Sequence, residues 1–280
     1  MNIDLYISRI SLAKRVLTGA FLLCIPMLAV AQQKPDSLSA PADSVAPLQL
    51  GAIGPISGNI INVEGITFKM ITVEGGRLQM EVENPEATDS LAPKTIIREV
   101  SLHDFFIGET EVTQELWVAL MGYNPSRDKG PQKPVQGVRY VDIGLFLMKL
   151  NAITRRHFRL PTEEEWEYAA RGGRRTRNLP MAGSNDINDV GWYCNNSGNQ
   201  AHDVKGKWSN ELGLYDMSGN VSEWCTVSGG VGQRSASTRG HRQVLRGGGY
   251  LDFASHCLVN DRQESPSTIW ADDIGFRLAE

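Results

Sequence analysis

The sequence lacks any basic run long enough to follow the phosphate backbone of a nucleic acid. Its formal net charge is −4, and the densest basic patch, within residues 171–177, is interrupted by Gly172 and Gly173. Such a patch is typical of a solvated loop. We therefore do not predict nucleic-acid binding.

A long apolar run is also missing. The most apolar stretch, residues 16–30, has about fifteen residues, whereas a helix that spans a bilayer needs about 20. Basic residues precede this stretch, and Ala29, Val30 and Ala31 supply the small residues that signal peptidase requires. We predict a cleaved signal peptide over residues 1–31, with an uncleaved anchor as the alternative. The protein is then exported to the periplasm, the cell surface or the medium, and it contacts the membrane only transiently through this segment.

Aromatic residues are almost absent from residues 32–59, where Pro, Ser, Ala, Gly and Gln dominate. A segment of this composition cannot bury enough surface to offset the entropy that it loses on ordering. We predict a disordered tether over residues 32–59 and a folded domain over residues 60–280.

Cysteine is scarce as well. Without Cys24, which lies in the predicted signal peptide, the exported chain keeps Cys194, Cys225 and Cys257. In an oxidising compartment, an odd number of cysteines is most simply explained by one disulfide and one free thiol. The sequence leaves all three pairings open.

Glycine, in contrast, is abundant, with 28 of 280 residues, many of them after residue 170. Glycine-rich chains form turns and irregular loops, so little regular structure is expected there beyond short strands at residues 221–227, 243–245 and 274–278. Before residue 110 the pattern is more regular. Residues 66–73 alternate as a half-buried strand does, and further strands are predicted at 77–80, 96–102 and 105–108, with a polar loop at 83–93.

Three helices are predicted between these two regions. Thr113 is positioned to cap the first, and Asp142 to cap the second. At the third, Thr162 and Glu165 have the spacing of a capping box. Capping and the helix dipole account for the glutamates at 163–165, so we do not assign them a catalytic role.

Six strings occur in the order seen in one known family: ITVEGG from Ile71, EVTQ from Glu111, RLPTEEEWEYAARGG from Arg159, NELGLYDMSGNV from Asn210, LRGGGY from Leu245 and IGFRL from Ile274. On these strings, residues 66–280 resemble the formylglycine-generating-enzyme, or sulfatase-modifying-factor, family of the C-type-lectin-like fold. The resemblance implies an α+β domain that is rich in loops, with a small antiparallel sheet, a few helices and buried aromatic residues.

Enzymes of that family oxidise a sulfatase cysteine to formylglycine with molecular oxygen and a copper ion held by two cysteines. The resemblance puts Cys257 at the first copper position and Arg262 at the second. Arginine stays protonated and offers no lone pair, so it cannot ligate copper. Copper is therefore not expected, and the alternative for Cys257 is a disulfide, with Cys225 as the preferred partner.

Calcium is the ion that the resemblance supports better. Asp216 and Glu223 enclose a tight loop that contains Gly219 and Val221, and the family uses these positions for calcium. Two carboxylates with main-chain carbonyls are the hard oxygen ligands that calcium prefers. The alternative is that the carboxylates only hydrogen-bond loop amides.

The segment from 251 to 273, with Tyr250 just before it, is polar and contains scattered aromatic residues. In a diversified branch of the fold, this region displays a variable ligand-binding surface, and aromatics with arginine among small polar residues suit such a surface. An ordinary solvated loop is the alternative. Ser222 stands where the family usually has tryptophan, which predicts a more open surface nearby. The candidate ligand-binding residues are Tyr250, Phe253, His256, Asn260, Arg262 and Trp270.

Three functions are compatible with these observations. We favour a non-catalytic module that binds a protein or glycan ligand through the 251–273 loop. The first alternative is a copper-dependent formylglycine-generating oxidase, with Cys257 as its catalytic residue. The second is a structural subunit of a cell-envelope assembly.

Overall fold

The computed structural model describes residues 59–84, 94–227 and 242–280, which all belong to one unit spanning Gln49–Glu280. The predicted signal peptide and, apart from Asn59, the predicted tether lie outside these ranges. So does most of the predicted polar loop at 83–93.

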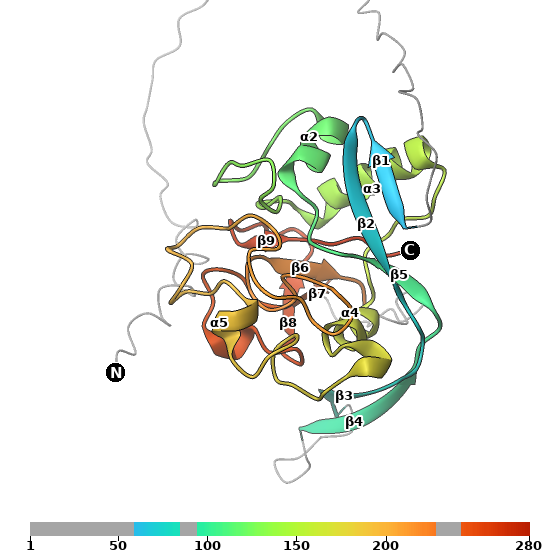
Figure 1. The fold of residues 1–280 in the computed structure, drawn as a ribbon, viewed down its shortest axis with the longest axis vertical. Coiled ribbons are helices and arrows are strands. Elements are labelled where there is room, and N and C mark those ends of the chain that lie inside the picture. The colour runs from blue at the N-terminus through green and yellow to red at the C-terminus, as the bar shows by residue number, and fades with distance from the viewer. Residues whose placement is uncertain (1–58, 85–93, 228–241) are drawn as a thin grey trace, which may run out of the picture. The chain divides into compact units, whose positions relative to one another are not determined.

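The first sheet has three antiparallel strands in the order β1-β2-β5 (Figure 1). They are β1 (Ile60–Val63), β2 (Ile66–Val73) and β5 (Phe105–Gly108). The predicted alternation of β2 holds from Ile66 to Met70, where Thr67 and Lys69 are exposed and Met70 is buried. It breaks after Met70, because Val73, three residues further on, is buried as well. The sequence did not reveal β1, which pairs with β2 through the register Ile60↔Lys69.

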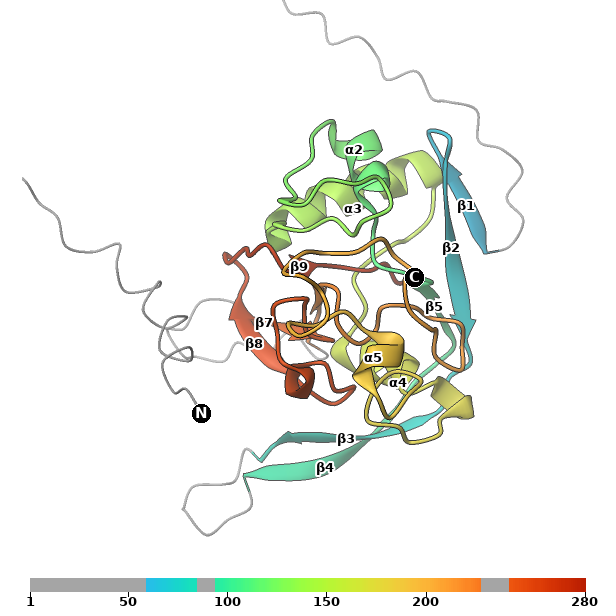
Figure 2. The ribbon, with the colours of Figure 1, turned by 60° about the vertical axis from the view of Figure 1, so that its left-hand side comes forward.

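A separate two-stranded hairpin is formed by β3 (Arg77–Glu83) and β4 (Thr95–Ser101), with Arg77 opposite Ser101. Both strands were predicted to within a few residues. The hairpin contacts helix α4 and lies at the end of the described unit that is opposite to α2 and α3 (Figures 1 and 2).

Three helices follow the β-rich part: α2 (Gln114–Met121), α3 (Tyr140–Thr154) and α4 (Glu163–Ala170). Thr113 is the N-cap residue of α2, but its side chain makes no capping bond. The prediction that Asp142 caps α3 was wrong. Arg139 is the N-cap residue, and Asp142 lies one turn inside, where its carboxylate accepts from the Arg139 backbone and guanidinium. The capping box of Thr162 and Glu165 is confirmed at α4.

The C-terminal sheet has the order β8-β7-β6-β9, and β9 pairs in parallel with β6. Its strands are β6 (Ser222–Cys225), β7 (Arg242–Arg246), β8 (Gln263–Pro266) and β9 (Ile274–Gly275). Three of them confirm the predicted short strands, whereas β8 lies inside the segment predicted as a loop. Short helical turns complete the described chain: η1 (Gly173–Arg175), α5 (Ile187–Val190) and η2 (Ala254–His256).

Aromatic rings fill the main core between α2, α3 and the C-terminal segment. The Trp117 ring stacks on Phe146 with 5.3 Å between centroids, and Phe276 packs edge-on against both. This packing and the mixture of small sheets with few helices confirm the predicted loop-rich α+β fold. Among the residues described, no helix combines the length and the apolar character that crossing a bilayer requires.

Candidate functional site

The thiol of Cys257 lies directly after η2 in a small apolar cluster with Met181, Ile187, Val190 and Tyr193. It is fully buried, and Cys194 packs against the same cluster. Burial raises the pKa of the Cys257 thiol, and the nearby Asp252 and Asp261 carboxylates raise it further. Because the thiolate is the form that binds metals and acts as a nucleophile, this environment keeps the sulfur unreactive.

The predicted disulfide between Cys225 and Cys257 is not formed. In the described chain Cys194, Cys225 and Cys257 are all free thiols. Cys225 lies on β6 and packs in the part of the core that contains Trp166 and Val244, whereas Cys257 lies in the apolar cluster beside α5. The segments that carry the two cysteines therefore direct their thiols into different clusters.

Arg262 lies at the approach to β8 and faces helix α4 instead of Cys257. Its Nε atom donates to Glu163 at 2.6 Å, and another guanidinium nitrogen donates to Glu264 at 3.0 Å. Among the described residues, no group of three or more His, Cys, Asp and Glu side chains is arranged to hold a metal ion. With a guanidinium in an ion pair at one position and a protonated thiol at the other, the residues present do not fit copper.

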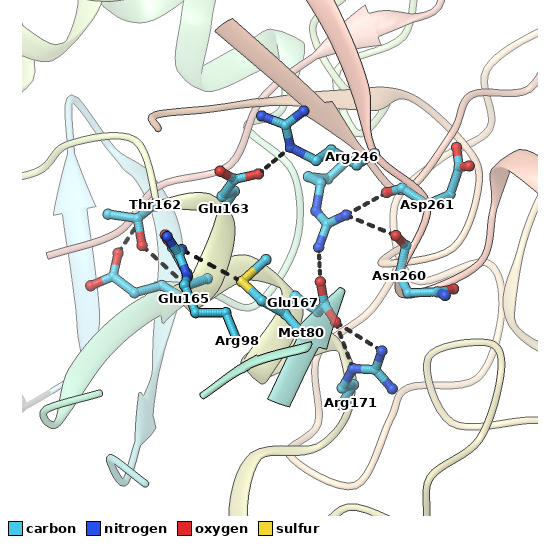
Figure 3. A network of polar contacts seen from close by, with 12 residues as sticks. Met80, Arg98, Thr162, Glu163, Glu165, Glu167, Arg171, Arg246, Asn260 and Asp261 are labelled. Atoms are coloured by element: carbon cyan, nitrogen blue, oxygen red, sulfur yellow. Dashed lines mark hydrogen bonds and ion pairs between the residues drawn. The ribbon is translucent and has the colours of Figure 1, made fainter. Parts of the chain in front are cut away.

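Helix α4 carries four glutamates, each of which pairs with an arginine. Figure 3 shows part of this set, with Glu167 between Arg171 and Arg246. We call this set the α4 ion-pair cluster; its pairs are Glu163–Arg262, Glu164–Arg98, Glu165–Arg159, Glu167–Arg246 and Glu167–Arg171. The arginines come from β4, the segment before α4, β7, the end of α4 and the start of β8. The sequence predicted only the capping role of these acids and did not reveal their ion pairs with arginine.

Arg246 connects the α4 cluster to the segment after Tyr250. Its side chain is fully buried, pairs with Glu167 and lies over the Trp166 ring. The same guanidinium donates to the main-chain carbonyls of Asn260 at 3.3 Å and Asp261 at 2.6 Å (Figure 3). Helix α4 therefore holds the backbone of the predicted recognition loop in place.

The four predicted calcium positions lie in a second buried polar centre. Glu223 on β6 accepts from Arg277 at 2.6 and 2.7 Å and from the Trp166 indole N–H at 2.7 Å. Arg277 also donates to the carbonyls of Gly108 and Tyr215. Glu111 accepts from the Asn220 amide and the Val221 backbone N–H. We call Glu111, Asp216, Glu223 and Arg277 the Arg277 cluster.

Asp216 is the exception within the Arg277 cluster. Its Oδ2 atom accepts from the Lys205 backbone N–H at 2.8 Å, but its buried Oδ1 atom has no hydrogen-bond partner among the described residues. Burial, with the Glu223 charge nearby, raises the pKa of Asp216 to about 6. Burial and the neighbouring carboxylates also raise the pKa of Glu111 well above its usual value.

An oxygen-binding cation would fit this arrangement through at most two of its carboxylates together with main-chain carbonyls, because no three acidic side chains of the described residues converge on a metal position. Three carboxylates share one guanidinium, so the buried groups carry an excess of two negative charges when all are ionised. The unpartnered Asp216 oxygen lies in the loop whose Gly219 and Val221 carbonyls were predicted as further ligands. Because Glu223 already accepts three hydrogen bonds, Asp216 is the better carboxylate donor for calcium.

The candidate ligand-binding residues divide into exposed and covered side chains. Phe253 and Trp270 are each 60% exposed, Asn260 is exposed and His256 is half-buried. Tyr250 must be removed from the predicted surface, because it is fully buried and its hydroxyl lies against Gln136 and the Asp272 carbonyl.

Ser222 does not open the surface as predicted. It is a buried residue of β6, and its hydroxyl lies 3.5 Å from an Asp252 carboxylate oxygen. A small side chain at this position is therefore accommodated by packing of the 249–252 turn, where the Gly249 N–H also bonds to Asp252.

The sulfatase-modifying factor enzyme 1-like domain family matches residues 63–280, which is most of the chain. A chaperone protein, LppX, from Paenibacillus barcinonensis is 35% identical over 263 residues, and the match spans 76% of this chain and 89% of that protein. Inactive C-alpha-formylglycine-generating enzyme 2 from Bos taurus is 28% identical, over 84% of this chain and 96% of that protein.

Among solved structures, variable protein 1 of Treponema denticola superimposes with a TM-score of 0.67 at 30% identity. The superposition covers 79% of this chain and 97% of that one.

Proposed function

The chain belongs to the sulfatase-modifying factor enzyme 1-like domain family, and we propose that it is an exported, non-catalytic member that binds a protein ligand. The observation that carries this proposal is the ion pair of Arg262 with Glu163 at the position expected for the second copper cysteine. A copper site of the family's kind needs two thiolates, and this chain offers one buried, protonated thiol there.

The relatives support the same reading. One is named a chaperone and another an inactive enzyme, and both match most of this chain. A chaperone acts on proteins, which favours a protein ligand over the glycan that the sequence left open.

The recognition surface is built on the segment after Tyr250. Phe253 and Trp270 expose most of their rings to solvent, and large exposed aromatics supply much of the binding energy of protein interfaces. Arg246 and the α4 cluster hold the backbone at Asn260 and Asp261, so this part of the surface is ordered before the ligand arrives. Preorganisation of this kind lowers the entropic cost of binding.

The test compares the wild type with a Phe253→Ser, Trp270→Ser double variant in pull-downs from envelope extracts, followed by calorimetry on the partner identified. The matched control is Trp208→Ser, because Trp208 is 69% exposed and lies outside the 251–273 segment. We expect the double variant to bind about thirtyfold or more weakly and the control to bind normally. Retention of every partner by the double variant would remove this surface from the proposal. If glycosidase treatment of the extract is enough to abolish binding, the ligand is a glycan and not a protein.

Calcium is the ion we propose for the Arg277 cluster, with Asp216, Glu223 and the carbonyls of Gly219 and Val221 as ligands. Its positive charge would stabilise the buried carboxylates, as a structural ion does. At neutral pH, free calcium at about 100 times its Kd should stabilise the fold by about 2–3 kcal/mol. Thermal unfolding with calcium and with EDTA measures this. Asp216→Asn should abolish the calcium response, and an undiminished response in that variant would place the ion elsewhere.

Cys257 and Arg262 do not fit copper, so the alternative of a copper oxidase would need Cys194 as its second sulfur. Cys194 packs against the cluster that contains Cys257 and is only partly buried, so it is the described thiol best placed to serve as a second sulfur. Incubation with copper, oxygen and a Cys-x-Pro-x-Arg peptide, followed by mass spectrometry, tests this. We expect no aldehyde; aldehyde formation that is lost in Cys257→Ser would establish the enzyme instead.

A further inference from the structure

Helix α3 is apolar on its outer face as well as on its inner face. Ile143, Phe146 and Leu150 point into the core, as expected for one face of a helix. On the opposite side, Val141, Leu145 and Met148 are 66%, 43% and 61% exposed. Their spacing of four and three residues places them in one row along the helix.

The outer row contains no charged side chain. Gly144 and Ala152 share its face and are exposed, and a Cβ atom built on Gly144 would meet nothing within 4 Å. The charged residues of the helix, Asp142 and Lys149, lie about a quarter-turn away, toward α2, where Lys149 donates to the Leu120 carbonyl. A helix that is apolar all round normally has both faces covered.

Positive charge surrounds this row. Residues 139–157 contain Arg139, Lys149, Arg155 and Arg156 against the single acid Asp142, a net +3 in a chain of net −4. Arg139 and Arg155 are exposed at the two ends of the helix. Ion pairs with Asp142 and Glu280 offset two of these charges, and Lys149 is held by the Leu120 carbonyl, which leaves the exposed Arg155 to act on a partner.

An amphipathic aromatic residue lies beside the same helices. Tyr123 follows α2, is 48% exposed and packs edge-on against Trp117, which in turn stacks on Phe146 of α3. Tyrosine rings with a free polar end are enriched where proteins meet the headgroup region of a bilayer.

We propose that the outer face of α3, formed by Val141, Leu145 and Met148, docks on a lipid surface that carries anionic headgroups. The apolar row enters the boundary between headgroups and acyl chains, and Arg155 interacts with the headgroup charges, with Lys149 adding positive charge nearby. The helix lies in the plane of the interface and does not cross the bilayer.

A second copy of the chain fits this face less well. A helix of 15 residues is about 22 Å long, so a row about 10 Å wide offers on the order of 200–300 Å² per copy. Specific protein interfaces bury about 800 Å² on each partner. Binding to a lipid surface requires neither an interface of that area nor a complementary shape. Anionic headgroups also attract the positive charges beside α3, whereas two copies of the chain would bring these like charges together.

The test is cosedimentation of the full chain with vesicles of phosphatidylglycerol and phosphatidylcholine, and with vesicles of phosphatidylcholine alone. The variant is Val141→Glu, Met148→Glu. The matched control is Ile97→Glu on β4, because Ile97 is 65% exposed, like Val141, but lies on the hairpin at the other end of the unit. The N-terminal residues are identical in all three proteins, so differences between them report on α3.

We expect the α3 variant to bind the anionic vesicles at least about tenfold more weakly, while the control binds like the wild type. Arg155→Glu should weaken binding to the anionic vesicles by a smaller factor, and salt should do the same to the wild type. Equal binding by the wild type and the α3 variant would overturn the proposal. A wild-type dimer that the α3 variant converts to a monomer would also overturn it, in favour of a second copy as the occupant.

Discussion

The α4 cluster and the Arg277 cluster are both buried groups of carboxylates, but only the first is matched by arginines. Four glutamates of α4 meet five arginines, whereas Glu111, Asp216 and Glu223 share Arg277. The first cluster is therefore complete within the chain. In the second, burial and the neighbouring carboxylates raise the pKa values of Asp216 and Glu111, so these groups take up protons more readily than ordinary carboxylates.

The comparison separates two roles for buried acids. In the α4 cluster, the glutamates fix distant segments of the chain, including the backbone at Asn260 and Asp261. In the Arg277 cluster, the raised carboxyl pKa values should make stability depend on pH, and the calcium proposed above would add a dependence on that ion. The predictions below test this contrast, beginning with the largest effect.

Arg246→Met should reduce the free energy of unfolding by about 3–5 kcal/mol. Arg246 is fully buried, so its removal leaves Glu167 without its buried partner and leaves two loop carbonyls without a donor. Urea unfolding followed by circular dichroism measures the change.

Arg77→Met is the control for that measurement, because Arg77 pairs with Glu99 across the exposed face of the β3–β4 hairpin. A surface pair of this kind contributes about 0–1 kcal/mol. If the two variants lost similar stability, the distinction between a buried matched cluster and an ordinary surface pair would be wrong.

Stability without calcium should fall as the pH rises from about 4 to about 6. The pKa of Asp216 is about 6 in the folded protein, whereas an unperturbed aspartate has a pKa of 3.8. Between these two pH values the folded state therefore binds more protons than the unfolded state. A group with a raised carboxyl pKa stabilises the fold at low pH and loses that contribution as it ionises, here about 3 kcal/mol. Thermal unfolding across this pH range in EDTA measures the loss.

Asp216→Asn separates the contribution of Asp216 to the pH dependence of stability from that of the other carboxylates. Some of these carboxylates change stability with pH in the opposite direction. The pKa of Asp142, for example, is lowered by its hydrogen bond to Arg139, so its contribution is lost on acidification. The difference between the wild type and Asp216→Asn should therefore shrink on acidification toward pH 4. A difference that is constant with pH would show that Asp216 is already ionised throughout.

Local patterns in the sequence predicted the local structure well. The capping box of Thr162 and Glu165 involves a few neighbouring residues and is confirmed, and so is the strand at residues 66–73, whose alternation holds as far as Met70. The arginine partners of the α4 glutamates lie as many as 99 residues away along the chain, as Arg262 does from Glu163. A pairing over that distance depends on the tertiary fold and leaves no spacing signal.

The same reason explains the errors at the candidate site. Tyr250 resembled a surface aromatic, but its burial depends on Gln136 and on the carbonyl of Asp272, which only the fold brings together. The Cys225–Cys257 pairing assumed that adjoining strands direct their thiols toward each other. The positions of three of the short strands were predicted, but the order of the strands and the side to which each thiol points were not.

Arg262 completes the α4 cluster at its exposed edge, so its loss should cost less than that of Arg246. Its side chain is 27% exposed, and we expect Arg262→Cys to reduce the free energy of unfolding by about 1 kcal/mol in urea. The variant restores the family's second copper cysteine in sequence, but residue 262 faces Glu163 while Cys257 lies in the cluster beside α5. Competition with a Cu(I) chelator should therefore give the variant and the wild type the same affinity. A tenfold gain in Cu(I) affinity in Arg262→Cys would mean that the two positions approach each other, and that Arg262 is the residue that keeps this chain from holding Cu(I) between two thiols.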